Sequence, residues 1–185
     1  EGSFVLPATD DGLAGTGPIR RYDWFQKLWT EKRSGWAKRL KQDQDGLVFL
    51  GDSITQGWGA NLNQLFPGIK TINRGISGDT TRGVLLRLQE DVIALNPRGI
   101  VLLIGTNDLE EAAPPESTAS NLKLIFAALR AHNPAMPIVL CNVFPSSATK
   151  KRPAEQIKKI NQLCYALLKD EPQVTPLDTW ALFAN

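Results

Sequence analysis

The sequence predicts an α/β fold built on one parallel β-sheet, and two observations lead to this class. Short apolar runs recur along the chain, and segments with the 3.6-residue periodicity of amphipathic helices separate them. The runs are apolar almost throughout, which is typical of parallel strands covered on both faces. A chain of 185 residues with 42% hydrophobic content suits one domain with a sizeable core. The predicted strands are residues 47–50, 69–72, 100–104, 138–143 and 174–177.

The residues before the first strand are expected to form an arm and one helix. Residues 1–20 mix Gly, Pro, Asp and Thr with little periodicity, whereas residues 22–41 follow a helical pattern. We expect residues 1–46 to pack on a core formed by residues 47–185, with a ligand platform as the less favoured role of the helix. The apolar stripe of this helix consists of Phe25, Leu28, Trp29, Trp36 and Leu40.

Three longer helices are predicted between the later strands, at residues 82–95, 118–130 and 153–169. Ser117 or Thr118 is a suitable N-cap for the second of them, because a side-chain oxygen there can accept a backbone hydrogen bond.

The charge balance argues against a nucleic-acid partner. Charged residues make up 22% of the chain and the formal net charge is +2, so no strongly acidic or basic partner is implied. The basic run at residues 150–152 is expected to be a solvated loop. No apolar run approaches the roughly 18 to 20 residues of a membrane-spanning helix.

The cysteine and histidine content argues against a metal site. Cys141 and Cys164 lack metal-ligand spacing and are expected to be free buried thiols, and His132 is the single histidine. No cofactor is expected. The chain starts at Glu1 without a charged and apolar leader, which fits a processed secreted protein or a trimmed chain. A secreted or periplasmic location is favoured over a cytoplasmic one.

Small and polar residues follow each of the first three predicted strands. The segments are GDS at residues 51–53, NRGISGDTT at residues 73–81 and GTND at residues 105–108. In open parallel sheets the ligand site lies beyond the carboxyl ends of the strands, so these loops are expected to meet at one edge. Each carries glycine beside a group that can donate a hydrogen bond or attack a carbon, as acyl transfer requires.

Other sequence motifs fit this edge less well. A phosphate-binding P-loop would need a lysine near Gln56, and the dinucleotide pattern GxGxxG is absent. The nucleophile elbow GxSxG fails because Thr55 stands where its second glycine belongs.

The three loops together resemble the sequence blocks of the SGNH, or GDSL-type, esterase and acylhydrolase family. GDSITQGW is similar to the first block, GISGDTT to the second and GTND to the third, in the family's order. The run NRGISGDTTRGVLLRL is similar to the branch that contains intracellular platelet-activating-factor acetylhydrolase catalytic subunits and related bacterial carbohydrate esterases. The resemblance covers about residues 47–185. It implies a flavodoxin-like three-layer α/β/α sandwich with a five-stranded parallel sheet.

Position by position, the resemblance implies that Ser53 is the catalytic nucleophile. It also implies that the Gly78 N–H, the Asn107 side-chain amide and the Ser53 N–H bind the oxyanion. Each residue also has a plain structural alternative, namely a helix N-cap for Ser53, a turn for Gly78 and a loop-capping amide for Asn107. Trp58 is a candidate for lining the acyl or alcohol pocket, with core packing as the alternative.

The aspartates beside these residues are expected to have structural roles. Asp52, Asp79 and Asp108 are expected to brace the three loops by accepting hydrogen bonds from backbone N–H groups. Asp178 ends the fifth apolar run at the same edge of the sheet and is also expected to be structural.

The base that would activate Ser53 is not evident. The family has a histidine three residues after an aspartate in a C-terminal DxxH block, which this sequence lacks. His132 precedes a strand, so we expect it at the surface, roughly 15–20 Å from the catalytic edge. Ending a domain directly after its fifth strand would also leave apolar sheet surface uncovered, at roughly 25 cal/mol per Å². We therefore expect the C-terminal part of the domain to be missing, with the catalytic Asp and His beyond residue 185.

Three explanations stay open: a fragment of a nicked protein, part of a longer reading frame, or a natural protein without the base. The expected function is a serine esterase that cleaves a short acyl ester, an acetyl ester above all, of a carbohydrate or small alcohol. The alternative is a non-catalytic carbohydrate- or ester-binding module. The expected partners are the ester substrate and, for a nicked chain, its own C-terminal fragment.

Overall fold

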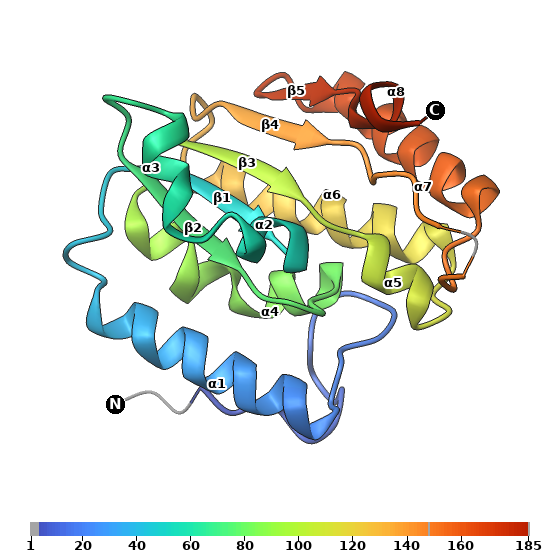
Figure 1. Cartoon of the computed structure of the whole chain (residues 1–185), viewed down its shortest axis with the longest axis horizontal. Coiled ribbons are helices and arrows are strands. Elements are labelled where there is room, and N and C mark those ends of the chain that lie inside the picture. The colour runs from blue at the N-terminus through green and yellow to red at the C-terminus, as the bar shows by residue number, and fades with distance from the viewer. Residues whose placement is uncertain (1–3, 148, 185) are drawn as a thin grey trace.

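The chain folds into the α/β architecture that the sequence predicts (Figure 1). The computed structural model describes residues 4–147 and 149–184. Its five-stranded sheet has the order β2-β1-β3-β4-β5, and every pair of neighbours is parallel. This is the flavodoxin-like order, whose topological switch point lies between β1 and β3. The strands are β1 (Leu47–Gly51), β2 (Thr71–Gly75), β3 (Gly99–Leu103), β4 (Ile138–Cys141) and β5 (Val174–Leu177).

Helices connect the strands. The α-helices are α1 (Asp23–Lys38), α2 (Ser53–Gly57), α3 (Leu62–Leu65), α4 (Thr81–Asp91), α5 (Thr106–Glu110), α6 (Pro115–His132), α7 (Ala154–Leu167) and α8 (Thr179–Phe183). Short 3₁₀-helices are η1 (Gly59–Asn61), η2 (Ile93–Leu95) and η3 (Leu168–Asp170).

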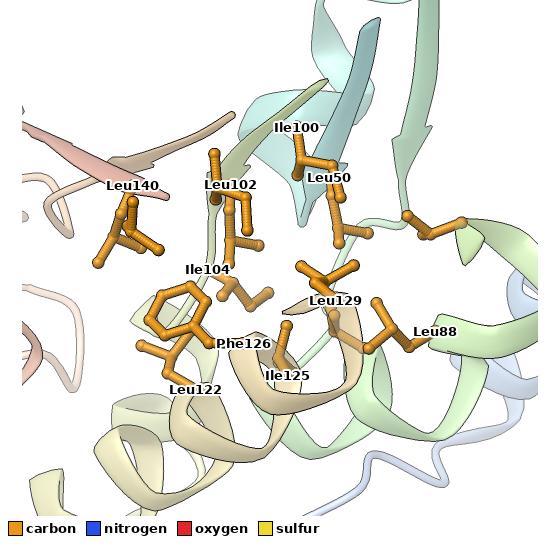
Figure 2. Close-up of a cluster of buried hydrophobic side chains, with 14 of the residues drawn as sticks. Leu50, Leu88, Ile100, Leu102, Ile104, Leu122, Ile125, Phe126, Leu129 and Leu140 are labelled. Carbon is orange, nitrogen blue, oxygen red and sulfur yellow. The ribbon is translucent and has the colours of Figure 1, made fainter. Parts of the chain in front are cut away.

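The main hydrophobic core lies on the face of the sheet that α4, α6 and α7 cover. Figure 2 shows side chains of β1, β3 and β4 pointing at the apolar stripes of α6 and α4. Because side chains alternate along a strand, this face takes every second residue. The fully buried residues of this contact include Val48, Leu50, Ile100, Leu102, Leu122, Ile125, Phe126 and Leu129.

The opposite face of the sheet is less completely covered. The intervening strand residues Phe49, Val101 and Val139 line an apolar groove of about 420 Å³. Among the described residues, the helices that contribute to this groove are the short α2, α3 and α8, and residues between elements add Trp58, Phe66 and Phe144. The two faces of one sheet therefore have different environments, one packed and one hollow.

Helix α1 lies beyond α4 on the β2 side of the sheet (Figure 1). Phe25 and Trp29 are fully buried in a second cluster together with Ile76 from the loop after β2. This part of the predicted stripe therefore packs as expected, whereas Leu40 lies beyond the helix and is 38% exposed.

Some predicted boundaries are wrong. Neither Ser117 nor Thr118 caps α6, because the helix begins at Pro115, whose missing N–H suits the first turn. The second strand is Thr71–Gly75 rather than residues 69–72. His132 is the last residue of α6 rather than a loop residue, and it is exposed just before β4.

Candidate active site

Ser53 lies at the carboxyl end of β1, where it begins the short helix α2. Asp52 is the N-cap, since its Oδ1 accepts a hydrogen bond from the Ile54 N–H at 2.9 Å. Ser53 is therefore not the cap, and its side chain is exposed. Gly51 is required before it, because a Cβ there would lie 2.2 Å from the Leu103 carbonyl oxygen.

The loop after β2 lies directly against this turn. The Ile76 N–H donates to the Gly51 carbonyl at 3.1 Å, and the Ser77 N–H donates to Gln56 Oε1 at 2.8 Å. Gly78 has a φ of 87°, which favours glycine, within a turn closed by the Asp79 N–H and the Ile76 carbonyl at 3.0 Å. No described residue accepts a hydrogen bond from the Gly78 N–H.

Asn107 follows β3 in α5 and is 2% exposed. Its Nδ2 donates to the Asp79 carbonyl at 2.9 Å, and its Oδ1 accepts from Arg152 Nη2 at 3.1 Å. These two contacts fix which way the amide points. The second hydrogen on Nδ2 has no acceptor among the described residues, so it is available to donate a hydrogen bond to a ligand.

The three neighbouring aspartates brace the loops, as the sequence predicts. Asp52 accepts from the Ile54 N–H, Asp79 from the Thr80 N–H at 3.0 Å, and Asp108 from the Thr81 N–H at 3.0 Å.

Burial raises the pKa of each of these aspartates. The pKa of Asp52 rises to about 6, and that of Asp79 also rises to about 6 although the Arg87 guanidinium opposes the effect. No cation of the described part of the chain is bonded to Asp108, and burial raises the pKa of Asp108 to about 7. These carboxyls hold the loops at a cost in charge desolvation.

Arg87 is a structural residue of the site that the sequence analysis missed. It is fully buried, and its Nε donates to Asp79 Oδ2 at 2.8 Å. Its Nη2 donates to the carbonyls of Arg74 at 2.9 Å and Gly51 at 3.3 Å. The available signal was an arginine on the same face of α4 as the buried Leu88 and Val84.

Arg152 and Arg20 were missed as well. Arg152 Nη2 donates to Glu110 Oε2 at 2.7 Å as well as to Asn107, and Arg20 Nη2 donates to the same Glu110 oxygen at 2.6 Å. Arg152 therefore contacts a predicted site residue, so the prediction of a solvated loop at residues 150–152 is wrong for Arg152. Neither arginine has a local motif, because their partners are far along the chain.

The remaining predicted residues lie outside this constellation. Trp58 is 45% exposed and lines the apolar groove, so it is not a core residue. Asp178 caps α8 by accepting from the Ala181 N–H at 3.0 Å. Cys141 and Cys164 are free and buried, and burial raises their pKa values to about 11 and about 12.

Over residues 4–147 and 149–184, no cluster of His, Cys, Asp and Glu is placed to hold a metal ion. No helix in this part of the structure has the length and apolar character needed to cross a bilayer.

A model described as the GDSL-like lipase/acylhydrolase family matches residues 49–185. The chain belongs to this family. The matched segment of this GDSL-like chain holds Ser53, Gly78 and Asn107, whereas the arm and α1 precede it.

Similar proteins agree with the family. Platelet-activating factor acetylhydrolase IB subunit alpha2 of Homo sapiens and that of Bos taurus are each 28% identical over 158 residues. These alignments cover 82% of this GDSL-like chain and 66% of each relative, so the chain spans just under two thirds of the relatives' length.

Two solved structures share the fold. A GDSL-like lipase from Bacteroides thetaiotaomicron is 28% identical with a TM-score of 0.65, covering 81% of this chain and 76% of that one. A protein of Streptococcus pneumonia, solved as a candidate platelet activating factor, has a TM-score of 0.80 at 25% identity. The match covers 88% of this chain and 80% of the Streptococcus chain.

Proposed function

We propose that this chain carries the nucleophile and oxyanion-binding groups of a serine esterase. The substrate would be a short-chain acyl ester, above all an acetyl ester, of a carbohydrate or small alcohol. The observation that carries the proposal is the exposed Ser53 at the start of α2, with the loops after β2 and β3 bonded beside it.

In the proposed reaction, Ser53 Oγ forms a bond to the ester carbonyl carbon and gives up its proton to a base. The tetrahedral intermediate places negative charge on the former carbonyl oxygen, which the Ser53 N–H, the Gly78 N–H and Asn107 Nδ2 would bind. The bond to the alcohol oxygen then breaks, and that oxygen takes the proton. Water hydrolyses the acyl-serine by the same steps and releases the acid.

The proposal needs a base, and none of the residues that the structure describes is placed beside Ser53 in that role. Ser53 Oγ has no hydrogen-bond partner among the described residues, and His132 lies before β4, at the opposite edge of the sheet. We propose that this base is a histidine oriented by an aspartate, as in the DxxH block of the resembled family. The same observation favours the second candidate, a module that binds a carbohydrate or ester without turnover.

A kinetic comparison of the complete gene product tests the proposal. Ser53→Ala is expected to lower kcat/KM for p-nitrophenyl acetate by about 10⁴-fold or more, because a serine hydrolase without its nucleophile retains only binding and oxyanion effects. The matched control is Ser120→Ala on the exposed side of α6, which should leave the rate unchanged.

Two results would contradict the esterase. Full activity in Ser53→Ala would show that another residue attacks the ester. Binding of an acetylated sugar by the complete wild-type protein without release of acetate would favour the binding module.

A further inference from the structure

Tyr22 and Trp24 form an exposed aromatic pair at the start of α1. The two side chains are 52% and 51% exposed, their ring planes are within 11° of each other, and their centroids are 6.3 Å apart. The neighbouring Phe25 is fully buried and contacts Trp24 edge to face at 5.7 Å, which anchors the pair. Large aromatic side chains that stay in solvent while their neighbours are buried are available to a ligand.

This pair lies against the proposed oxyanion site. A Cβ at Gly78 would be 2.6 Å from Trp24 Cη2 and 3.0 Å from Arg20 Nη1. A substrate whose carbonyl oxygen binds the Gly78 N–H is therefore in reach of the indole ring. The family-model match begins at residue 49, so the pair lies outside the segment that defines the family.

The surface beside the aromatic pair is a polar pocket of about 430 Å³. Glu110 and Glu111 line it and are held by Arg20 Nη2 at 2.6 Å and Nε at 2.7 Å. Arg20 is 8% exposed, yet its Nη1 has no acceptor among the described residues. The Tyr22 hydroxyl donates to Glu111 Oε2 at 3.2 Å, which joins the aromatic pair to this polar wall.

We propose that this pocket binds the sugar ring of a carbohydrate ester, with the pyranose stacked on Trp24 and Tyr22. A pyranose has an apolar C–H face that suits an aromatic ring, and hydroxyls at its edge that suit carboxylates and a guanidinium. Glu110 and Glu111 would accept hydrogen bonds from hydroxyls, and Arg20 Nη1 would donate one. The inference rests on the proposed esterase function and assigns the alcohol half of its substrate.

An aromatic pair beside carboxylates could also bind a quaternary ammonium group. The charges of this pocket argue against such a ligand. Arg20 and Arg152 already bind the two carboxylates, and Lys150 and Lys151 add further positive charge to the lining. A cationic head group would be repelled there, whereas a neutral sugar would not.

The experiment compares two kinds of acetyl ester in the complete protein. The sugar esters are mono-acetylated methyl pyranosides of glucose, xylose and mannose, and p-nitrophenyl acetate and acetylcholine are the esters without a sugar. Trp24→Ala should raise KM for the preferred sugar ester at least tenfold and raise KM for p-nitrophenyl acetate several-fold less than that. Tyr165→Ala is the matched control, because Tyr165 is 61% exposed on α7.

Three results would overturn the sugar site. The first is an equal effect of Trp24→Ala and Tyr165→Ala on every sugar ester. The second is an equal loss with p-nitrophenyl acetate, which would make Trp24 part of the general site. The third is a selective loss with acetylcholine, which would indicate a quaternary ammonium site.

A failure of the esterase itself is distinguishable from a failure of the sugar site. If the wild-type protein hydrolyses neither kind of ester, titration with the same methyl pyranosides followed by tryptophan fluorescence still tests the pocket. Saturable binding that Trp24→Ala abolishes and Tyr165→Ala preserves would support the sugar site alone. Absence of binding in the wild-type protein would overturn it.

Discussion

Asn107 has the most constrained side chain among the proposed catalytic groups. The Asp79 carbonyl holds its Nδ2, and Arg152 holds its Oδ1, so the remaining Nδ2 hydrogen has one direction available. An oxyanion donor is effective when its direction is set before the charge develops. Arg152 is therefore a positioning residue in the proposed reaction.

A double-mutant cycle tests this role. Asn107→Ala should lower kcat for acetyl ester hydrolysis by about 100- to 1000-fold. Arg152→Met should lower it by about tenfold with KM unchanged, because one hydrogen bond that orients the amide is lost. In the Asn107→Ala background Arg152→Met should have no further effect. Arg152→Lys should restore activity, since a single nitrogen makes both contacts of Arg152. Additive losses would show that Arg152 acts independently of Asn107.

The sequence predicts the position of a single residue best when that residue lies in the loop that directly follows a strand. The structure brings the loops that carry Ser53, Gly78 and Asn107 together, as the parallel sheet predicts, while their catalytic roles stay proposals. Arg152 could not be found in this way, because its partners Asn107 and Glu110 lie far from it in the chain. For Arg87 the one signal was its place on the buried face of α4.

At the scale of elements, the predicted second strand shows how a buried charge misleads pattern analysis. The run at residues 69–72 is more apolar than the true strand Thr71–Gly75, which contains Arg74. Arg74 is nevertheless buried, because it pairs with Asp43 at 2.9 Å and lies over the Trp36 ring at 4.8 Å. Both partners precede the strand, so hydropathy along the strand carries no trace of them.

The junction between α4 and α5 should make stability depend on pH. Asp108 in α5 accepts from the Thr81 N–H in α4, and burial raises its pKa to about 7. The unfolded chain loses this proton near pH 3.9. Between these pKa values only the folded state holds the proton, so the free energy of unfolding falls as pH rises from about 4 to 7.

Asp108→Asn should flatten this dependence. In urea denaturation of the wild-type chain, the contribution of Asp108 to the free energy of unfolding should be roughly 2–3 kcal/mol smaller at pH 8 than at pH 5. The variant should lack this difference. Asp170→Asn, at an exposed position, is the control and should keep the wild-type slope. Parallel pH profiles for Asp108→Asn and the wild type would rule out Asp108 as the source.

At the scale of the whole molecule, the two faces of the sheet should respond differently to the same substitution. Val48 on β1 is fully buried under the helices, whereas Val101 on β3 faces the apolar groove. In the 185-residue chain, Val48→Ala should lower the free energy of unfolding by roughly 2–3 kcal/mol, because it removes contacts and leaves a cavity.

Val101→Ala should cost clearly less, because its side chain has fewer atoms around it to lose. Denaturant titration of both variants measures the difference. Equal costs would indicate that the groove is closed in solution. The α/β class and the uncovered apolar sheet surface were predicted from the sequence. Which face would be uncovered was not, since both sets of strand residues are apolar.

The Arg20–Glu110–Arg152 bridge has a consequence for how relatives of this protein can be recombined. Arg20 belongs to the arm, whereas Glu110, Glu111 and Arg152 belong to the segment that matches the family. In a chimera whose arm lacks an arginine at this position, Glu111 would lose its ion-pair partner and Glu110 would keep only Arg152. The exchangeable unit is therefore a set of four charged residues scattered along the chain, which have to be transplanted together.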